Sequence, residues 1–221
     1  MELAPLVLSF EVATIATLIA AIVGITVGAL LANFRFWGRD LVDVLFTAPL
    51  VMPPTVLGYY VLVLLGRRSA IGHAFETVTH TSIVFTKTGA VVAAVIGALP
   101  LVVKTVRAAL EEIDPTLSLA ARTLGASPWR AFFSVQLPLA TRGVVAALML
   151  AFARSLGDFG VTLMVAGDIP GETQTAALAI YDAILAQRDA DALLMISVLT
   201  VSVIGLLYVV AKLTARASDR A

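Results

Sequence analysis

Long apolar runs constrain this chain more than any other feature of its sequence. A helix needs about 20 apolar residues to cross the hydrocarbon core of a bilayer, and several runs approach or exceed that length. The chain is 60% hydrophobic and 14% charged over 221 residues, whereas soluble domains lie nearer half apolar and a quarter charged. The sequence therefore predicts an all-α integral membrane protein, one domain over residues 1–221 with about five transmembrane helices. The expected spans are 6–32, 41–65, 83–108, 143–166 and 192–211.

The first span carries a packing motif. Gly24 and Gly28 form a G-x-x-x-G pair, and such small residues let a second helix approach closely. We expect a close helix–helix contact at this point and no further role.

The second span contains Pro49, Pro53 and Pro54, so its helix must break or kink near the middle. Non-helical backbone at membrane depth persists only where it is buried in protein or lines a wet cavity. Interrupted helices often mark a transport route, where their freed N–H groups can meet an anion. Pro53 and Pro54 are therefore candidate residues of a translocation path or gate, and a purely structural kink is an equally good explanation.

Two ionisable residues, Arg154 and Asp158, interrupt the fourth apolar run. Ionisable groups at this depth cost several kcal/mol, so they pair or face a cavity. Their i, i+4 spacing places them on one helix face, where they can pair with each other. They either border the translocation path or form a self-satisfied pair that holds two helices together.

Three shorter polar or apolar segments lie between the spans. Residues 66–88 predict a solvated outer loop with some short helix, and the apolar run 176–185 is too short to span and predicts a re-entrant or interfacial helix. Glu111, Glu112 and Asp114 form an acidic cluster without a nearby histidine. A solvated loop start explains this cluster better than a metal or acid/base site.

Several kinds of chemistry are missing from the sequence. There are no cysteines, and the net charge of zero gives no indication of nucleic-acid binding. None of the three lysines follows a glycine, so the chain has no G-x-x-x-x-G-K-[ST] phosphate-binding loop. We therefore expect no enzyme activity, metal or cofactor on this chain itself, and any pumping must draw its energy from a partner.

The distribution of lysine and arginine predicts the orientation of the chain. With five spans and residues 114–138 inside, ten positive residues lie on the inner side and four on the outer side, as the positive-inside rule requires. The N-terminus is then outside and the C-terminus cytoplasmic. The inner residues are Arg35, Arg39, Lys104, Arg107, Arg122, Arg130, Arg142, Lys212, Arg216 and Arg220, and the outer ones are Arg67, Arg68, Lys87 and Arg188.

A polar stretch at residues 114–138 predicts a helix–turn–helix inside this apolar chain. Asp114 can cap a helix that begins at Pro115, and Gly125 can end it in a left-handed conformation. Ser127 and the following proline restart a second short helix. We expect Pro138 to end that second helix before the next apolar run.

This stretch resembles the "EAA loop" of ABC-importer permeases, whose pattern is E-A-A-x3-G-x9-I-x-L-P. Leu119 stands where the family often has glutamate, so a salt bridge from that position is not expected here. Val135 stands where the family has isoleucine. The resemblance implies a cytoplasmic coupling loop that docks on a separate ATPase subunit. Its expected site residues are Ala120, Ala121, Gly125, Ser127, Pro128, Trp129, Leu137 and Pro138.

Two further segments resemble molybdate permeases. They are 48–60 (APLVMPPTVLGYY) and 155–160 (SLGDFG), of which the second resembles sulfate permeases as well and has Asp158 in place of the commoner glutamate. The resemblance implies a type I ABC importer permease fold, a homodimer in the bacterial inner membrane, two cytoplasmic ATPase subunits that use ATP, and a periplasmic molybdate-binding protein. It implies molybdate or tungstate as substrate. A sulfate or thiosulfate permease is the nearest alternative, and a secondary transporter without an ATPase is the alternative from another class.

Overall fold

Every regular element is a helix in the part of the chain that the computed structural model describes, namely the backbone of residues 3–218 and the side chains of residues 3–212. The all-α prediction is therefore confirmed. The elements are α1 (Ala4–Asn33), α2 (Arg39–Val51), α3 (Pro54–Leu65), α4 (Ala70–Thr79), α5 (Lys87–Glu111), α6 (Pro115–Thr123), α7 (Pro128–Ala131), the π-helical η1 (Phe132–Gln136), α8 (Leu137–Leu156), α9 (Gly160–Ala166), α10 (Ala176–Leu185) and α11 (Asp189–Ser218).

Four helical segments are long and apolar enough to cross a bilayer, and the bent pair α2–α3 supplies a fifth if it counts as one span. The four are α1, α5, the stretch Pro128–Leu156, and Asp189–Lys212 within α11. This agrees with the expected number of about five.

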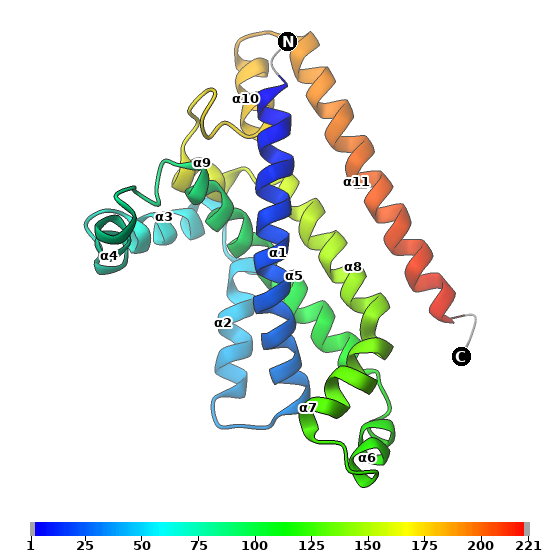
Figure 1. The fold of residues 1–221 in the computed structure, drawn as a ribbon. Coiled ribbons are helices and arrows are strands. Elements are labelled where there is room, and N and C mark those ends of the chain that lie inside the picture. The colour runs from blue at the N-terminus through cyan, green and yellow to red at the C-terminus, as the bar shows by residue number, and fades with distance from the viewer. Residues whose placement is uncertain (1–2, 219–221) are drawn as a thin grey trace.

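The centre of the bundle is built from α1, α5 and α8 (Figure 1). Their shared core consists largely of alanine and valine, including Ala20 of α1, Ala98 of α5 and Ala147 of α8. Small side chains suit helices that associate within a membrane, because close van der Waals packing drives that association.

The G-x-x-x-G motif of α1 lies at its contact with α5. A Cβ added at Gly24 would lie 2.6 Å from Cγ1 of Val102, and one at Gly28 would lie 3.0 Å from the carbonyl oxygen of Val103. Only glycine allows the two helices to come this close, so the packing role predicted for the motif is confirmed.

The third and fourth expected spans differ from the helices of the structure in informative ways. The third begins at Lys87 rather than at residue 83, because the Thr86 hydroxyl caps α5 by accepting the Gly89 N–H at 3.4 Å. The fourth is interrupted at residues 157–159, which separate α8 from α9.

The two ends of the bundle carry different elements (Figure 1). The N-terminal end of α1 lies near α10 and the beginning of α11, whereas α6, α7 and the α1–α2 turn lie at the opposite end. Ser9 joins α1 to α10, since its hydroxyl accepts the Ala176 N–H at 2.8 Å. From α2, the chain bends by 118° into α3, which leads away from the bundle towards α4 (Figure 1).

Candidate functional site

The loop between α5 and α8 begins with a capped helix. The Asp114 carboxylate accepts the Thr116 N–H at 2.9 Å, and Pro115 is the first residue of α6. That backbone hydrogen bond holds the pKa of Asp114 below its usual range. The predicted cap and first residue are confirmed.

The turn after α6 depends on a glycine. Gly125 has a φ of +91°, and its N–H bonds the carbonyl oxygen of Arg122 at 3.0 Å. The Ser127 hydroxyl then accepts the Arg130 N–H at 3.3 Å and caps α7. The predicted helix stop and restart are both confirmed, and the chain reverses within a few residues.

The expectation that Pro138 ends the second loop helix is wrong. α7, η1 and α8 follow one another without a break from Pro128 to Leu156. Inside a regular α-helix, Pro138 would lack a donor for the carbonyl of Ser134 and its ring would press on that carbonyl. The π-helical turn η1, in which the Leu137 N–H bonds the Phe132 carbonyl oxygen five residues back, relieves this conflict.

The aromatic residues of the loop divide between core and surface. Phe132 and Leu137 pack against the α1–α5–α8 core. Trp129 and Phe133 are 71% and 60% exposed, and Leu124 at the turn is 89% exposed. The loop therefore presents large apolar side chains that nothing covers in this protomer, and Leu117 and Leu119 of α6 are exposed as well.

The second candidate region lies where the two interrupted spans cross. Pro53 is extended, and Pro54 begins α3. A Cβ added at Gly160, the first residue of α9, would lie 2.7 Å from Cβ of Pro54. One turn further, a Cβ at Gly58 would lie 2.7 Å from Cβ of Met164. The break of the second span thus packs directly on the break of the fourth.

Arg154 and Asp158 lie beside this crossing and form the predicted pair, with Nη1 and Oδ1 3.1 Å apart. The expectation that both lie on one helix face is wrong, because α8 ends at Leu156 and Asp158 lies in the interruption. The other oxygen, Oδ2, accepts the Thr162 N–H at 3.0 Å and the Thr162 hydroxyl at 2.6 Å. Sequence reasoning missed Thr162, although a threonine four residues after an aspartate at a helix start is a recognisable signal.

The pair has a buried and an open side. The Asp158 side chain is 3% exposed and the Arg154 side chain 35%. A Cβ at Gly97 of α5 would lie 3.6 Å from both Nη2 of Arg154 and Oδ1 of Asp158. Both oxygens of the Asp158 carboxylate therefore have hydrogen-bond partners within the chain, whereas part of the Arg154 guanidinium remains accessible to solvent. The candidate path residues Pro54, Arg154 and Asp158 are brought to one region, with Pro53 adjoining it.

A cluster of five charged residues joins the first turns of α2 to the end of α5, and sequence reasoning missed it. Glu111 is solvent-exposed, as expected, and it also accepts from Arg107 at 2.8 Å and from Arg39 at 3.3 Å. Asp43 contacts Lys104 at 2.8 Å and Arg107 at 3.0 Å. The sequence did show opposite charges at i, i+4 spacing, Arg39 with Asp43 and Arg107 with Glu111, and these could have indicated ion pairs in this region. We call these five residues the ionic clamp.

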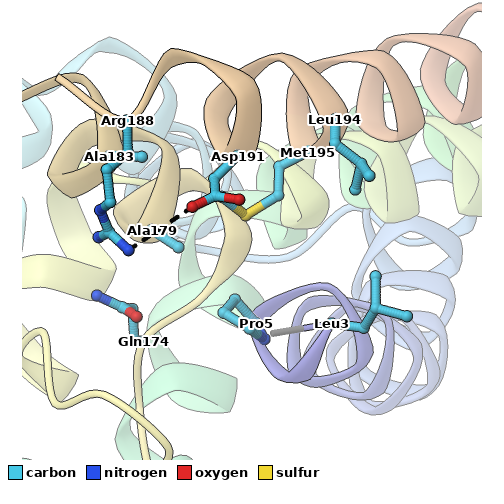
Figure 2. A pocket seen from close by; sticks show the side chains of 9 residues that line it. All are labelled: Leu3, Pro5, Gln174, Ala179, Ala183, Arg188, Asp191, Leu194 and Met195. Carbon is cyan, nitrogen blue, oxygen red and sulfur yellow. Dashed lines mark ion pairs between the residues drawn. The ribbon is translucent and has the colours of Figure 1, made fainter. Parts of the chain in front are cut away.

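A pocket of about 250 Å³ lies at the opposite end of the bundle, between the start of α1, α10 and α11. Figure 2 shows the side chains of Gln174, Arg188 and Asp191 around it, and Arg188 and Asp191 form a long ion pair of 3.8 Å. Nearby, the Gln174 amide donates to Asp182 at 2.8 Å. Burial and the neighbouring Asp182 raise the pKa of Asp168 above its usual range.

No group of three or more His, Cys, Asp or Glu residues that could hold a metal ion occurs among the described residues.

Comparisons with known proteins give a consistent result. Residues 24–221 match the family described as "Binding-protein-dependent transport system inner membrane component". The molybdenum transport system permease protein of Haemophilus influenzae is 45% identical over 82% of this chain and 79% of its own length. The sulfate transport system permease protein of Escherichia coli is 36% identical over 76% of this chain and 61% of its own length. The fold is similar to a chain of the MetNI methionine ABC transporter in an inward-facing conformation, with a TM-score of 0.73 and 19% identity over 96% of this chain and 94% of the other.

Proposed function

The chain belongs to the family of binding-protein-dependent transport system inner membrane components, and from that premise we propose that it forms the membrane path through which an ABC importer takes up molybdate or tungstate. The observation that carries the proposal is the 45% identity to a molybdenum transport permease over most of both chains. The identity to a sulfate permease is lower, at 36%. Sulfate is therefore the second candidate substrate.

The loop from Asp114 to Pro138 would dock on the cytoplasmic ATPase subunit. Leu124, Trp129 and Phe133 offer the apolar anchors that a helix-in-groove contact requires. Ala120, Ala121 and Gly125 would shape the helix and its turn, whereas Ser127 and Pro128 would start the next helix. ATP would be bound and hydrolysed by that partner.

The complete transporter would be a homodimer with two ATPase subunits and a periplasmic molybdate-binding protein. Two observations support this. No residue of α2, all of which the structure describes, is fully buried within one protomer, and Tyr59 and Tyr60 of α3 are exposed. These faces are available to a second copy at the dimer axis. The opposite end, with α10 and residues 167–175, would meet the binding protein.

The proposed orientation puts the N-terminus outside and the C-terminus in the cytoplasm. The excess of lysine and arginine on the α6–α7 side supports it. Arg216 and Arg220 contribute to that count as sequence positions, and their side chains lie outside the described residues. The location would be the bacterial inner membrane.

The path would run beside the crossing of the two interrupted spans. The first N–H groups of α3 have no side-chain cap, and the accessible part of Arg154 lies in the same region. Because Asp158 neutralises Arg154, an oxyanion would meet weak attraction there, which favours passage over retention. Selectivity would then come mainly from the soluble binding protein.

Transport would proceed by alternating access. Closure of the ATP-loaded ATPases would draw the two coupling loops together and open the cavity at the dimer axis outwards, and hydrolysis would reset it. A direct test supplies proteoliposomes with the permease, its ATPase and its binding protein, and measures uptake of labelled molybdate, tungstate and sulfate. ATP-dependent uptake of molybdate or tungstate over sulfate supports the proposal. Preference for sulfate would move the assignment to the second candidate.

A secondary transporter is the alternative from another class. Such a carrier would purify from membranes without an ATPase and would move its substrate without ATP. Co-purification under mild detergent, followed by uptake with and without ATP, separates the two.

A further inference from the structure

α2 is held to its own protomer by charged contacts beside a half-buried apolar side formed by Val42, Phe46 and Pro49. None of its residues, all of which the structure describes, is buried, and Leu41, Val44 and Leu45 are each more than 60% exposed. The α5 helix beside it buries many residues, among them Val102 and Val106. The ionic clamp supplies the ion pairs between α2 and α5, in addition to this half-buried packing.

One guanidinium joins the two halves of the clamp. Arg107 contacts Glu111 on its own helix through Nε at 2.8 Å and Asp43 on α2 through Nη1 at 3.0 Å. The second oxygen of Asp43 contacts Nζ of Lys104 at 2.8 Å. The side chains of Asp43 and Arg107 are only 24% and 22% exposed, and a shielded, multiply bonded network holds its geometry better than an isolated exposed pair.

Arg39 extends the clamp to α1. Its guanidinium contacts Glu111 at 3.3 Å, and its Nε donates to the carbonyl oxygen of Leu31 at 2.9 Å. The end of α1, the start of α2 and the end of α5 are thereby fixed to one another.

The clamp lies at one end of a route between the two candidate regions. Glu111 is the last residue of α5, and Asp114 caps α6 only three positions later. At its other end, after 13 residues or about 20 Å of helix, α2 leads into the Met52–Pro53 break. Beyond that break, Pro54 rests on Gly160.

We propose that the ionic clamp transmits movement of the coupling loop to α2, and through α2 to the crossing of the interrupted spans. Its members are positioning residues, since they touch no substrate. When the ATPases move α5 and α6, an intact clamp makes α2 follow. Without the clamp, α2 keeps only its half-buried apolar side and the turn at residues 34–38, and it would follow α5 less closely. The inference rests on the proposed function of the chain as an ABC permease.

The test is an uptake-to-hydrolysis ratio. Asp43→Asn removes the carboxylate charge that pairs with Lys104 and Arg107. In proteoliposomes with the ATPase and binding protein, molybdate taken up per ATP hydrolysed should fall by at least about five-fold, the lower end of typical coupling effects. Complex assembly and ATP hydrolysis should persist, and Asp43→Glu should restore much of the ratio.

A matched control separates the clamp from charge loss in general. Arg67→Gln breaks the exposed Arg67–Glu76 pair of 3.3 Å near α4 and should leave the ratio unchanged. A wild-type ratio in Asp43→Asn would overturn the proposal. A parallel fall of hydrolysis and uptake in a complex that still assembles would also overturn it, because the ratio is then unchanged.

A second variant covers the case of poor folding in Asp43→Asn. The chain has no cysteine, so Asp43→Cys/Lys104→Cys can be joined by a short, reducible thiol cross-linker. The ratio should be low before cross-linking, recover with the link and fall again on reduction. Formation of the link without recovery would contradict the transmission role. If the wild-type complex itself shows no ATP-dependent oxyanion uptake, the proposed function fails, and that failure is visible before any clamp variant is measured.

Discussion

Replacement of Gly125 by alanine tests the coupling loop at its most constrained point. A Cβ at Gly125 would meet nothing within 4 Å, so the cost of the substitution is confined to the backbone at φ +91°. An L-residue in the left-handed region costs about 1–2 kcal/mol. The loop can relieve this strain by leaving the turn, which lowers the docking-competent population by about 5–30-fold.

The assay is ATPase binding by the solubilised permease, followed by ATP-dependent uptake in proteoliposomes. Gly125→Ala should weaken ATPase binding by about that factor, and uptake at limiting ATPase should fall with it. Gly125→Pro should be more severe, because proline cannot adopt a positive φ and loses the N–H that bonds Arg122. Both variants should still insert into membranes.

Gly171 provides the matched control. Its φ is +78° and a Cβ there would also meet nothing within 4 Å, but it lies in the loop before α10 at the opposite end. Gly171→Ala should carry a similar backbone cost and leave ATPase binding unchanged. Wild-type ATPase binding and uptake in Gly125→Pro would refute the reasoning, and equal loss of ATPase binding in Gly171→Ala would show that the effect is not local.

Three further predictions concern the crossing of the interrupted spans and the end of the bundle that carries α10. Asp158→Asn should lower the free energy of unfolding by about 2–3 kcal/mol, because it leaves Arg154 without its charge partner. This is less than the full cost of breaking a buried ion pair, since Arg154 is partly exposed. An unchanged unfolding midpoint in detergent would contradict this. Gly160→Ala should lower the free energy of unfolding by about 1–3 kcal/mol through overpacking, because its Cβ would lie 2.7 Å from Cβ of Pro54 at the start of α3, and it should reduce uptake. Gly205→Ala is the control, since a Cβ at that position meets nothing within 4 Å. Because the pKa of Asp168 is raised in the folded state, the contribution of Asp168 to stability should be fully present below the unfolded pKa of about 4 and be lost as pH rises through the folded pKa. Asp168→Asn should flatten that decline in unfolding midpoints measured across pH, and a variant with the wild-type slope would exclude Asp168 as its source.

The local features of the fold were predictable wherever one residue type decides the backbone. Asp114 and Gly125 fix the start and stop of α6 through a side-chain cap and a positive φ, and both effects are visible in the sequence. Apolar length likewise predicted the spans. Pro138 was misjudged because the usual rule treats an interior proline as a helix end, whereas a π-helical turn accommodates it.

The candidate sites were predictable in composition but not in arrangement. The spacing of Arg154 and Asp158 indicated their pair, but not that Asp158 also caps the following helix through Thr162. Pro54 and Gly160 are more than 100 positions apart in the sequence, and a local sequence pattern cannot predict a contact between such distant residues. The ionic clamp was not predicted for the same reason, since Asp43 and Lys104 come together only because α2 packs on α5.

The uninterrupted helix from Pro128 to Leu156 has a mechanical consequence. The 25 positions between Trp129 and Arg154 correspond to about 38 Å at the rise of an α-helix. The helix continues through the π-helical turn η1 without a break, so no loop separates the exposed indole from the guanidinium. A tilt imposed at the Trp129 end would therefore reach the Arg154 end along one continuous helix, in parallel with movement that reaches the crossing through α2.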